Sequence, residues 1–173
     1  GQFADISIDN MPGVSRSYSF ATPSQPDGQL SFFVRKVPGG IFSTTVNEQD
    51  LVGQPMQIEG PSGNFWLRSS DAPMLLLAGG SGLAPVLALL HDALAKGVSR
   101  SATLLFGART EADLYALEEI ESIARRWQGD FRFIPILSDC ASFDVWAGRC
   151  GLVGDLIPEI TVPGAHAYLC GPP

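Results

Sequence analysis

The sequence predicts a small antiparallel β-barrel followed by an α/β domain built on a parallel sheet. Up to about residue 70, apolar and polar residues alternate and turn residues recur roughly every ten positions, as in short antiparallel strands. From Pro73 onward, apolar strand-like runs alternate with helical patterns, which is typical of βαβ units whose sheet is covered on both faces. The change falls near "RSSDAP", so residues 1–70 and 71–173 are expected to form two domains.

Five segments of the first part have the pattern of barrel strands. They are residues 3–8, 16–21, 30–37, 56–59 and 65–68, separated by turns such as "PSQPDGQ", "PGG" and "EGPSGN". One short helix is expected near "STTVNEQ". Several short strands without helical spacing favour a small barrel.

The second part begins with a strand at "MLLLAG" and a helix at "APVLALLHDALAKG", with Pro85 in its first turn and Gly97 placed to end it. Three further strands are expected at "SATLLFG", "FRFIPIL" and "HAYLC". Residues 110–127 have helical spacing, and Thr110 with Asp113 resembles a capping box. Residues 151–160 indicate a weaker helix or an irregular crossover.

The amino-acid composition limits the classes of function that the chain can have. The 173 residues are 45% hydrophobic, which is ample for a packed core, and the net charge is −7. With eleven Lys and Arg scattered along the chain, no nucleic-acid surface is expected. Three cysteines, Cys140, Cys150 and Cys170, match neither a disulfide framework nor a C-x-x-C metal site, which favours a reducing, cytoplasmic setting. His91 and His166 have no metal partners at useful spacing, so no metal site is predicted.

Both ends of the chain have the pattern of cuts through a longer protein. "GQFADISID" begins inside a strand, and "AHAYLCGPP" is a strand that runs into a turn. We therefore expect a fragment, and we see no secretory or transit peptide at its beginning.

The uncharged run "MLLLAGGSGLAPVLALL" at residues 74–90 is near the lower length limit for a membrane span. Its glycines and proline instead indicate a buried strand, a turn and a buried helix, so no membrane span is expected. A glycine-rich turn at that junction exposes N–H groups at a helix N-terminus, where a phosphate is favoured. The run Gly80-Ser81-Gly82-Leu83-Ala84-Pro85 departs from G-x-G-x-x-G at its third glycine, so a tight turn that needs small residues stays an alternative.

Six short motifs occur along the chain in the order found in the ferredoxin–NADP reductase family. They are "RSYS" (16–19), "GGIFST" (39–44), "EGPSGNF" (59–65), "AGGSGLAP" (78–85), "FGAR" (106–109) and "YLCGPP" (168–173). The chain resembles the flavin and nicotinamide part of the reductase component of ring-hydroxylating dioxygenases and multicomponent monooxygenases.

The resemblance implies a flavin site in the first part. Arg16 would bind the flavin phosphate, Tyr18 would pack on the isoalloxazine and Ser19 would approach its N5, with Ser17 between them. Gly39, Gly40, Ile41, Phe42 and Ser43 would hold the flavin pyrophosphate, and Val34 would lie beside the flavin tail. Read from the residues alone, Tyr18 and Phe20 can equally be barrel core, and "GGIFST" a simple turn before a helix.

It also implies a nicotinamide nucleotide site in the second part. Gly80, Ser81, Gly82, Leu83 and Pro85 would take the pyrophosphate, and Cys170, Gly171 and Pro172 would lie against the nicotinamide. Arg109 could accept a 2′-phosphate, whereas Glu111 or Asp113 could contact the adenosine ribose, and a carboxylate there would repel a 2′-phosphate. The resemblance implies NADH rather than NADPH, because oxygenase reductases of this kind mostly use NADH.

The implied activity is hydride transfer from NADH to FAD, followed by single-electron transfer to an iron–sulfur carrier that serves a terminal oxygenase. Ser19 and Cys170 would position the reacting rings. No C-x₄-C-x₂-C cluster motif is present, so the ferredoxin would be a separate protein or a missing part of this chain. Three alternatives stay open: a flavin reductase, a globin-fused dioxygenase reductase, and a non-catalytic electron-transfer subunit that binds flavin only.

Overall fold

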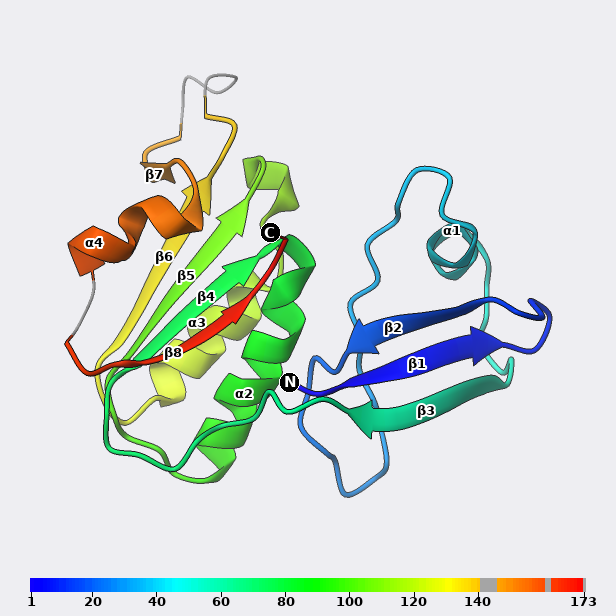
Figure 1. Cartoon of the computed structure of the whole chain (residues 1–173), viewed down its shortest axis with the longest axis horizontal. Coiled ribbons are helices and arrows are strands. Elements are labelled where there is room, and N and C mark those ends of the chain that lie inside the picture. The colour runs from blue at the N-terminus through cyan, green and yellow to red at the C-terminus, as the bar shows by residue number, and fades with distance from the viewer. Residues whose placement is uncertain (141–145, 161–162, 173) are drawn as a thin grey trace.

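The computed structural model describes residues 1–140, 146–160 and 163–172 and contains two sheets that lie side by side (Figure 1). The first half of the chain holds β1 (Phe3–Ile8), β2 (Ser15–Ser19), α1 (Ile41–Glu48) and β3 (Met56–Ser62). The second half holds β4 (Met74–Gly79), η1 (Gly80–Gly82), α2 (Leu83–Ala95), β5 (Ala102–Ala108), η2 (Glu111–Asp113), α3 (Leu117–Arg126), β6 (Phe131–Leu137), β7 (Arg149–Cys150), η3 (Val153–Leu156), α4 (Ile157–Ile160) and β8 (His166–Cys170).

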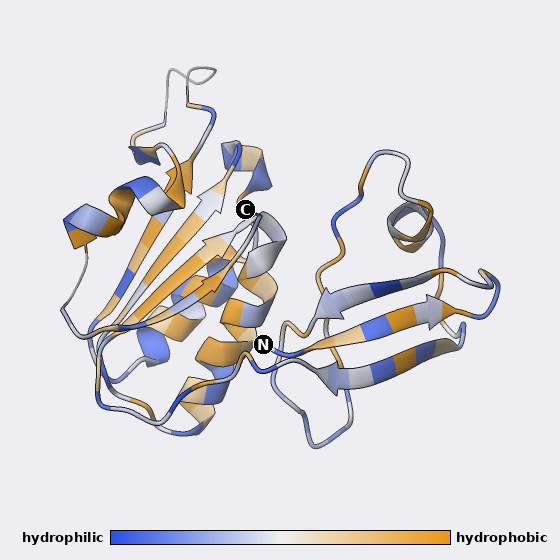
Figure 2. Ribbon diagram, in the orientation of Figure 1, coloured by the Kyte–Doolittle hydropathy of each residue, from blue (hydrophilic) through white to orange (hydrophobic). Residues whose placement is uncertain are grey.

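The first half is an antiparallel sheet with the strand order β2-β1-β3. Ala4, Ile6 and Ile8 alternate with polar residues along β1 and are buried on one face, where Phe42 of α1 covers them. Figure 2 shows this alternation along the strands of the first half. The predicted antiparallel half is therefore confirmed, with α1 where a short helix was expected.

Two of the predicted strands, 30–37 and 65–68, are wrong. A strand needs a partner for its backbone, and residues 30–37 form only one isolated bridge, Phe20 with Phe32. The Asn47 side chain of α1 donates to the Val34 carbonyl instead. In the described residues, the first half is thus a three-stranded antiparallel sheet.

Residues 65–68 are held by groups of the second half rather than by a sheet partner. The Arg68 N–H donates to the Tyr168 hydroxyl of β8 at 3.0 Å, and the Arg100 guanidinium donates to the carbonyls of Arg68 and Ala72. This segment is therefore the anchored connection between the two sheets.

The second half is a parallel sheet with the order β7-β6-β5-β4-β8, as the alternating pattern predicts. Successive residues of each strand point to opposite faces. Leu76 and Leu104 pack with α2 and α3, whereas Leu75 and Leu105 pack with the segment that contains η3 and α4. Both faces of the sheet are covered, as expected.

The apolar run 74–90 is β4, η1 and the first part of α2, which confirms a strand, a turn and a helix. In the described ranges, no helix has both the length and the apolar character that a bilayer crossing requires.

The predicted helix over 110–127 is interrupted. Thr110 and Asp113 do form the capping box, but it caps the short η2, and the chain turns at Ala116, which has a left-handed φ of 55°. Tyr115 is directed into the core, where its ring packs against Phe106. Helical structure then resumes at Leu117. The helical pattern is interrupted because the Tyr115 side chain is placed in the core.

Cys140 and Cys150 form a disulfide, which corrects the expectation that no cysteines are paired. The two residues follow β6 and end β7, and the parallel pairing of Leu137 with Cys150 brings the two segments together. Cys170 is the free cysteine of the described residues.

Candidate functional site

The residues of "RSYS" lie on β2, and the strand register decides which of them share a face. Tyr18 is opposite Ala4, and Arg16 is opposite Ile6, so both side chains lie on the α1 side of the sheet. The Tyr18 ring lies 5.5 Å from the Phe42 ring, and burial raises the pKa of its hydroxyl. Arg16 is exposed at the same face. A flat ring surface and an exposed cation are therefore neighbours.

Ser17 points to the opposite face, where its hydroxyl bonds to the Asp5 carboxylate. Ser19 ends β2, and the carboxyl end of this strand points toward the parallel sheet (Figure 1). The structure thus brings Arg16 and Tyr18 together, places Ser19 at the edge that faces the second half, and separates Ser17 from them.

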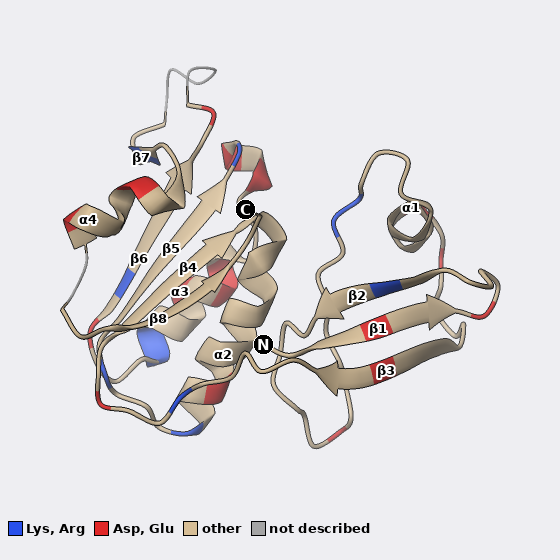
Figure 3. Ribbon diagram, in the orientation of Figure 1, with Lys and Arg blue, Asp and Glu red and all other residues tan. Residues whose placement is uncertain are grey.

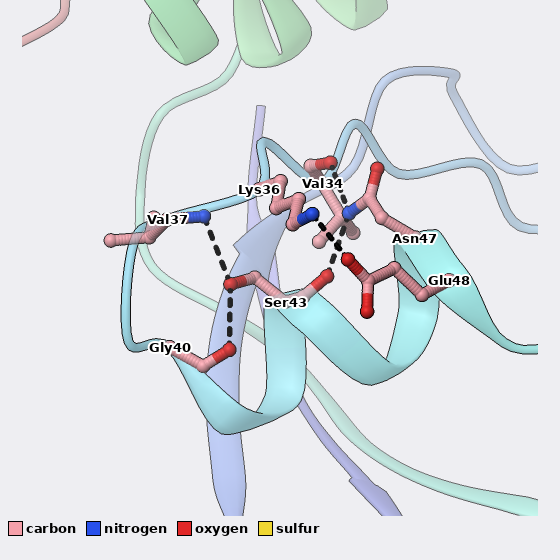
Figure 4. Close-up of polar contacts among 7 residues, drawn as sticks. All are labelled: Val34, Lys36, Val37, Gly40, Ser43, Asn47 and Glu48. Carbon is pink, nitrogen blue, oxygen red and sulfur yellow. Dashed lines mark hydrogen bonds and ion pairs between the residues drawn. The ribbon is translucent and has the colours of Figure 1, made fainter.

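The turn before α1 is organised by its own side chains (Figure 4). The Ser43 hydroxyl accepts a hydrogen bond from the Val37 N–H at 3.1 Å and donates to the Gly40 carbonyl at 3.2 Å. Asn47 bridges the Val34 and Ser43 carbonyls. Because Ser43 is buried and both its bonds are made within the turn, its side chain shapes this turn rather than pointing outward.

The backbone at the start of α1 can still receive an anion. Gly40 is its N-cap and makes no side-chain cap, so the first N–H groups of the helix have no intrahelical acceptor. Gly39 has a φ of 74° with open space at its Cα. Ile41 is exposed, whereas Phe42 is buried beneath Tyr18. Backbone groups, not the Phe42 side chain, are what this turn presents.

In the second half, the strand order reverses between β4 and β8. The chain runs from β4 outward through β5, β6 and β7 and then returns to place β8 on the other side of β4. In parallel sheets, ligands bind outside the carboxyl ends of the strands at such a switch point. The turn after β4 contains Gly80 and Gly82, and β8 ends at Cys170, so the two predicted nicotinamide nucleotide motifs meet there.

The two turns at the switch point touch through glycine. A Cβ added to Gly82 would lie 2.1 Å from the Cys170 carbonyl oxygen, and one added to Gly79 would lie 3.0 Å from the Pro172 ring. Close packing of the two turns therefore requires a glycine at position 82. This agrees with the tight turn of small residues that was kept as an alternative to a phosphate site. Pro173, the last residue of the "YLCGPP" motif, lies outside the described residues.

Only part of the predicted pyrophosphate segment is accessible. Leu83 is fully buried in the core of the second half and Pro85 is buried in the first turns of α2, so their side chains serve packing. Ser81 is exposed, and Gly80 has a φ of 50° with no atom within 4 Å of an added Cβ. Gly80 and Ser81 therefore leave a free space before α2 that a phosphate can enter.

Cys170 is half-buried at this edge. Burial raises the pKa of its thiol, so the thiol keeps its proton at neutral pH and is not an activated nucleophile. Its Cα pairs with Ala78 at the end of β4. The Cys170 thiol is therefore suited to packing contacts rather than to acting as an acid, a base or a nucleophile.

The first two residues of the chain touch both halves of the molecule. The Phe20 N–H, next to Ser19, donates to the Gln2 carbonyl at 2.9 Å. Gly1 lies against Pro85 in α2. Residues 1–2 thus lie between the Ser19 end of the first sheet and α2 of the second half.

A separate pocket of about 340 Å³ lies on the same seam between the halves. Phe20 and Leu30 line it from the first half, and Leu89 and Asp92 of α2 line it from the second. It includes neither Ser19 nor Cys170, so it is not the place where the predicted residues converge.

Charged residues gather at the carboxyl ends of β5 and β6 (Figure 3). Arg109 is exposed and lies 3.7 Å from the Asp139 carboxylate. The Asp113 carboxylate accepts hydrogen bonds from the Thr110 hydroxyl and N–H, and these bonds lower its pKa, with smaller contributions from Arg35 and Arg109. Asp113 is therefore an ionised carboxylate at neutral pH, in η2 just after the carboxyl end of β5.

Sequence reasoning missed two aromatic residues that join the halves here. Phe33 of the first half lies edge-on to Tyr115 with 5.1 Å between the ring centroids, and the Tyr115 hydroxyl donates to the Gly80 carbonyl at 3.1 Å. Tyr115 lay within a helical pattern, where an aromatic residue is ordinarily part of a core stripe. No local signal separates it from such a residue.

His91 and Glu119 join α2 to α3 with 2.6 Å between Nε2 and Oε1. In the described part of the chain, no three His, Cys, Asp or Glu side chains gather closely enough to hold a metal ion.

Together, the antiparallel sheet and the switch-point turn define a two-part oxidoreductase. Residues 1–66 match the model of the oxidoreductase FAD-binding domain, and residues 76–173 match that of the oxidoreductase NAD-binding domain. The chain belongs to the oxidoreductase NAD-binding domain family. FAD and a pyridine nucleotide are therefore its cofactor classes.

Similar proteins are reductase components. The chain is 44% identical over 174 residues to the xylene/toluene monooxygenase electron transfer component of Pseudomonas putida, covering 100% of this chain and 49% of the relative. It is 33% identical to the anthranilate 1,2-dioxygenase electron transfer component of Acinetobacter baylyi, covering 100% of this chain and 50% of that relative. The chain spans about half the length of these relatives.

Solved structures of the same class superpose over almost the whole chain. The Amycolatopsis cytochrome P450 reductase GcoB matches with a TM-score of 0.86 at 34% identity, covering 100% of this chain and 53% of that one. The ferredoxin reductase in carbazole 1,9a-dioxygenase matches with a TM-score of 0.87 at 28% identity, covering 99% and 52%. The resemblance to ferredoxin reductases is confirmed.

Proposed function

We propose that this chain is the flavin and nicotinamide part of an oxygenase reductase, and that it passes hydride from NADH to FAD and then single electrons to an iron–sulfur carrier. The observation that supports this most directly is that the first half reaches the predicted nucleotide turn: Phe33 packs on Tyr115, and the Tyr115 hydroxyl donates to the Gly80 carbonyl. The relatives that are electron transfer components of oxygenases support the same role. The iron–sulfur domain would be a separate protein or another part of the chain.

The first half fits a flavin. The exposed Arg16 guanidinium is suited to a phosphate, and Tyr18, fixed from below by Phe42, offers a flat ring surface. The backbone of Gly39 to Ser43 adds uncapped N–H groups at the start of α1 for the pyrophosphate. A site for two phosphates favours FAD over FMN. Val34 would lie beside the flavin tail.

The second half fits a dinucleotide. Gly80 and Ser81 leave room before α2, whose N-terminal dipole favours a phosphate. Asp113 would accept hydrogen bonds from the adenosine ribose, and its ionised carboxylate would repel a 2′-phosphate. This charge favours NADH over NADPH, although Arg109 lies nearby. Because Asp139 pairs with Arg109, the cation is partly neutralised.

When bound, the flavin ring accepts a hydride and releases electrons one at a time. Ser19 would donate a hydrogen bond at the reacting edge of that ring, and the protonated Cys170 thiol would hold the nicotinamide by contact. Gly171 and Pro172 shape the turn that carries this contact. The protein's contribution is to orient two rings and to exclude water between them. We place the boundary between the two domains at residues 70 and 71.

An absorption spectrum tests the proposal. After incubation with FAD and removal of the excess, the protein is expected to show oxidised flavin bands that bleach on anaerobic addition of NADH. Ser19→Ala is expected to slow bleaching by about 10- to 100-fold while FAD binding is kept, because one hydrogen bond in the transition state is lost. A chain that binds no FAD, or a yellow chain that NADH does not bleach, would contradict the proposal.

The nucleotide preference needs a separate variant. Asp113→Asn keeps the side-chain size and removes the charge, so the preference for NADH over NADPH should fall about tenfold. Glu121→Gln, on the exposed face of α3, is the matched control. An unchanged preference in Asp113→Asn would remove this carboxylate from the site.

A further inference from the structure

Tyr115 connects three parts of the molecule that the proposed reaction uses. Its hydroxyl donates to the Gly80 carbonyl at 3.1 Å, in the turn between β4 and α2. Its ring lies edge-on to Phe106 of β5 at 5.5 Å and to Phe33 of the first half at 5.1 Å. No other residue of the described ranges bonds by its side chain to this turn in the structure.

The backbone is shaped to place this side chain. Ala116, directly after Tyr115, has a φ of 55° and is the one non-glycine residue with positive φ among those described. L residues rarely adopt this conformation, and it interrupts a segment whose sequence has helical spacing from Thr110 to Trp127. Such a departure marks a position that the surrounding structure determines strongly.

The bond to Gly80 sets the direction of an N–H group. In a trans peptide, the carbonyl of one residue and the N–H of the next point in opposite directions. The Gly80 carbonyl is turned inward, where it accepts from Tyr115 and also from the Leu83 N–H. The Ser81 N–H of the same peptide therefore points away from Tyr115, and Ser81 is exposed.

We propose that Tyr115 is a positioning residue that fixes the Gly80–Ser81 peptide in the orientation that presents the Ser81 N–H to the nucleotide pyrophosphate, with Phe33 holding the ring from the first half. This inference rests on the proposed function. It assigns a residue that makes no contact with the nucleotide itself. Burial raises the pKa of Tyr115 to about 12, so the hydroxyl keeps the proton that it donates throughout the neutral range.

Tyr115→Phe tests the role of the hydroxyl because it removes one oxygen and keeps the ring between Phe33 and Phe106. The matched control is Tyr168→Phe, which removes the hydroxyl that accepts from the Arg68 N–H, away from the Gly80 turn. Affinity for NAD⁺ is measured by calorimetric titration of the FAD-loaded protein. We expect binding about five- to tenfold weaker in Tyr115→Phe and within about twofold of the unaltered chain in Tyr168→Phe.

Two further measurements separate positioning from general stability. FAD affinity in Tyr115→Phe should stay within about twofold, because the hydroxyl lies in the nucleotide half. Phe33→Leu keeps an apolar side chain but removes the ring contact, and we expect about threefold weaker NAD⁺ binding although the residue belongs to the first half.

The outcomes are distinguishable. If the unaltered chain binds NAD⁺ and Tyr115→Phe binds it equally well, the inference is overturned and the proposed function stands. Equal losses in Tyr115→Phe and Tyr168→Phe, in step with their melting temperatures, would also overturn it, since they would indicate a structural role only. Failure of the unaltered chain to bind NAD⁺ would overturn the proposed function and this inference with it.

Discussion

Gly82→Ala is the substitution whose effect the structure determines most directly. The added Cβ would lie 2.1 Å from the Cys170 carbonyl oxygen, 2.4 Å from its carbonyl carbon and 2.7 Å from the Gly171 nitrogen. All three are backbone atoms at the end of β8, so no change of rotamer can relieve the overlap.

The size of the effect follows from the distance that must be gained. Ordinary contacts are about 3.5 Å, so the turn before α2 and the end of β8 must separate by roughly 1.4 Å. Overpacking of this kind costs about 1–3 kcal/mol. For a chain of this size, a loss of about 2 kcal/mol lowers the melting temperature by roughly 4–8 °C. The same movement should weaken NAD⁺ binding, because both turns of the switch point are displaced.

Thermal unfolding measured by calorimetry, followed by NAD⁺ titration, tests both parts. Gly154→Ala is the control, since Gly154 is exposed and has no neighbour within 4 Å of an added Cβ. It should change the free energy of unfolding by less than about 0.5 kcal/mol. If Gly82→Ala has the same melting temperature as Gly154→Ala and the unaltered chain, the close contact between the two turns does not exist in solution.

Three other predictions concern stability. The pKa of Tyr115 is about 12 in the folded state against an ordinary value of 10, so the folded state holds this proton more tightly than the unfolded state does. The free energy of unfolding should therefore fall as the pH rises from 10 through 12, and it should fall less in Tyr115→Phe. Cys140→Ser opens the loop closed by the disulfide and should cost about 2–3 kcal/mol, so a reducing agent should lower the melting temperature of the unaltered chain but not that of the variant. In urea, Leu104→Ala should lose about 2–5 kcal/mol because its side chain is fully buried, whereas Leu152→Ala, 63% exposed, should lose less than about 0.5 kcal/mol; equal losses would contradict the assigned core.

Local patterns were sufficient for most of the second half. The apolar run of β4 is buried on both faces, α2 continues to Ala95, and Gly97 follows with a φ of 66°. The pairing of Thr110 with Asp113 was also predicted, because a capping box depends on residues three apart. These features are determined within a few residues, and the sequence contains all that determines them.

The errors lie where distant residues decide the structure. Residues 30–37 have a strand pattern, yet Asn47 and Ser43 of α1 take up their backbone groups. The break at Ala116 depends on the core position that Tyr115 fills, and the disulfide depends on the pairing of β6 with β7. Periodicity does not report any of these contacts.

The sequence predicted which residues belong to the candidate site, but not which of them present side chains to a ligand and which support the turns. Leu83 and Phe42 belong to the predicted motifs, yet their side chains are buried, and only backbone near them is available to a ligand. Motif spacing does not distinguish a residue that contacts a ligand from one that supports the turn. Strand register and burial make that distinction.

The position of β8 has a consequence for how the protein is made. β4 and β8 are neighbours in the sheet, yet Ala78 and its partner Cys170 are separated by most of the second half of the chain. During synthesis, this edge of β4 therefore stays open until β8 has left the ribosome and inserted beside it. The strands of the first sheet can pair long before β8 is made, so the edge that carries the predicted nucleotide motifs is completed later than the edge that carries the predicted flavin motifs.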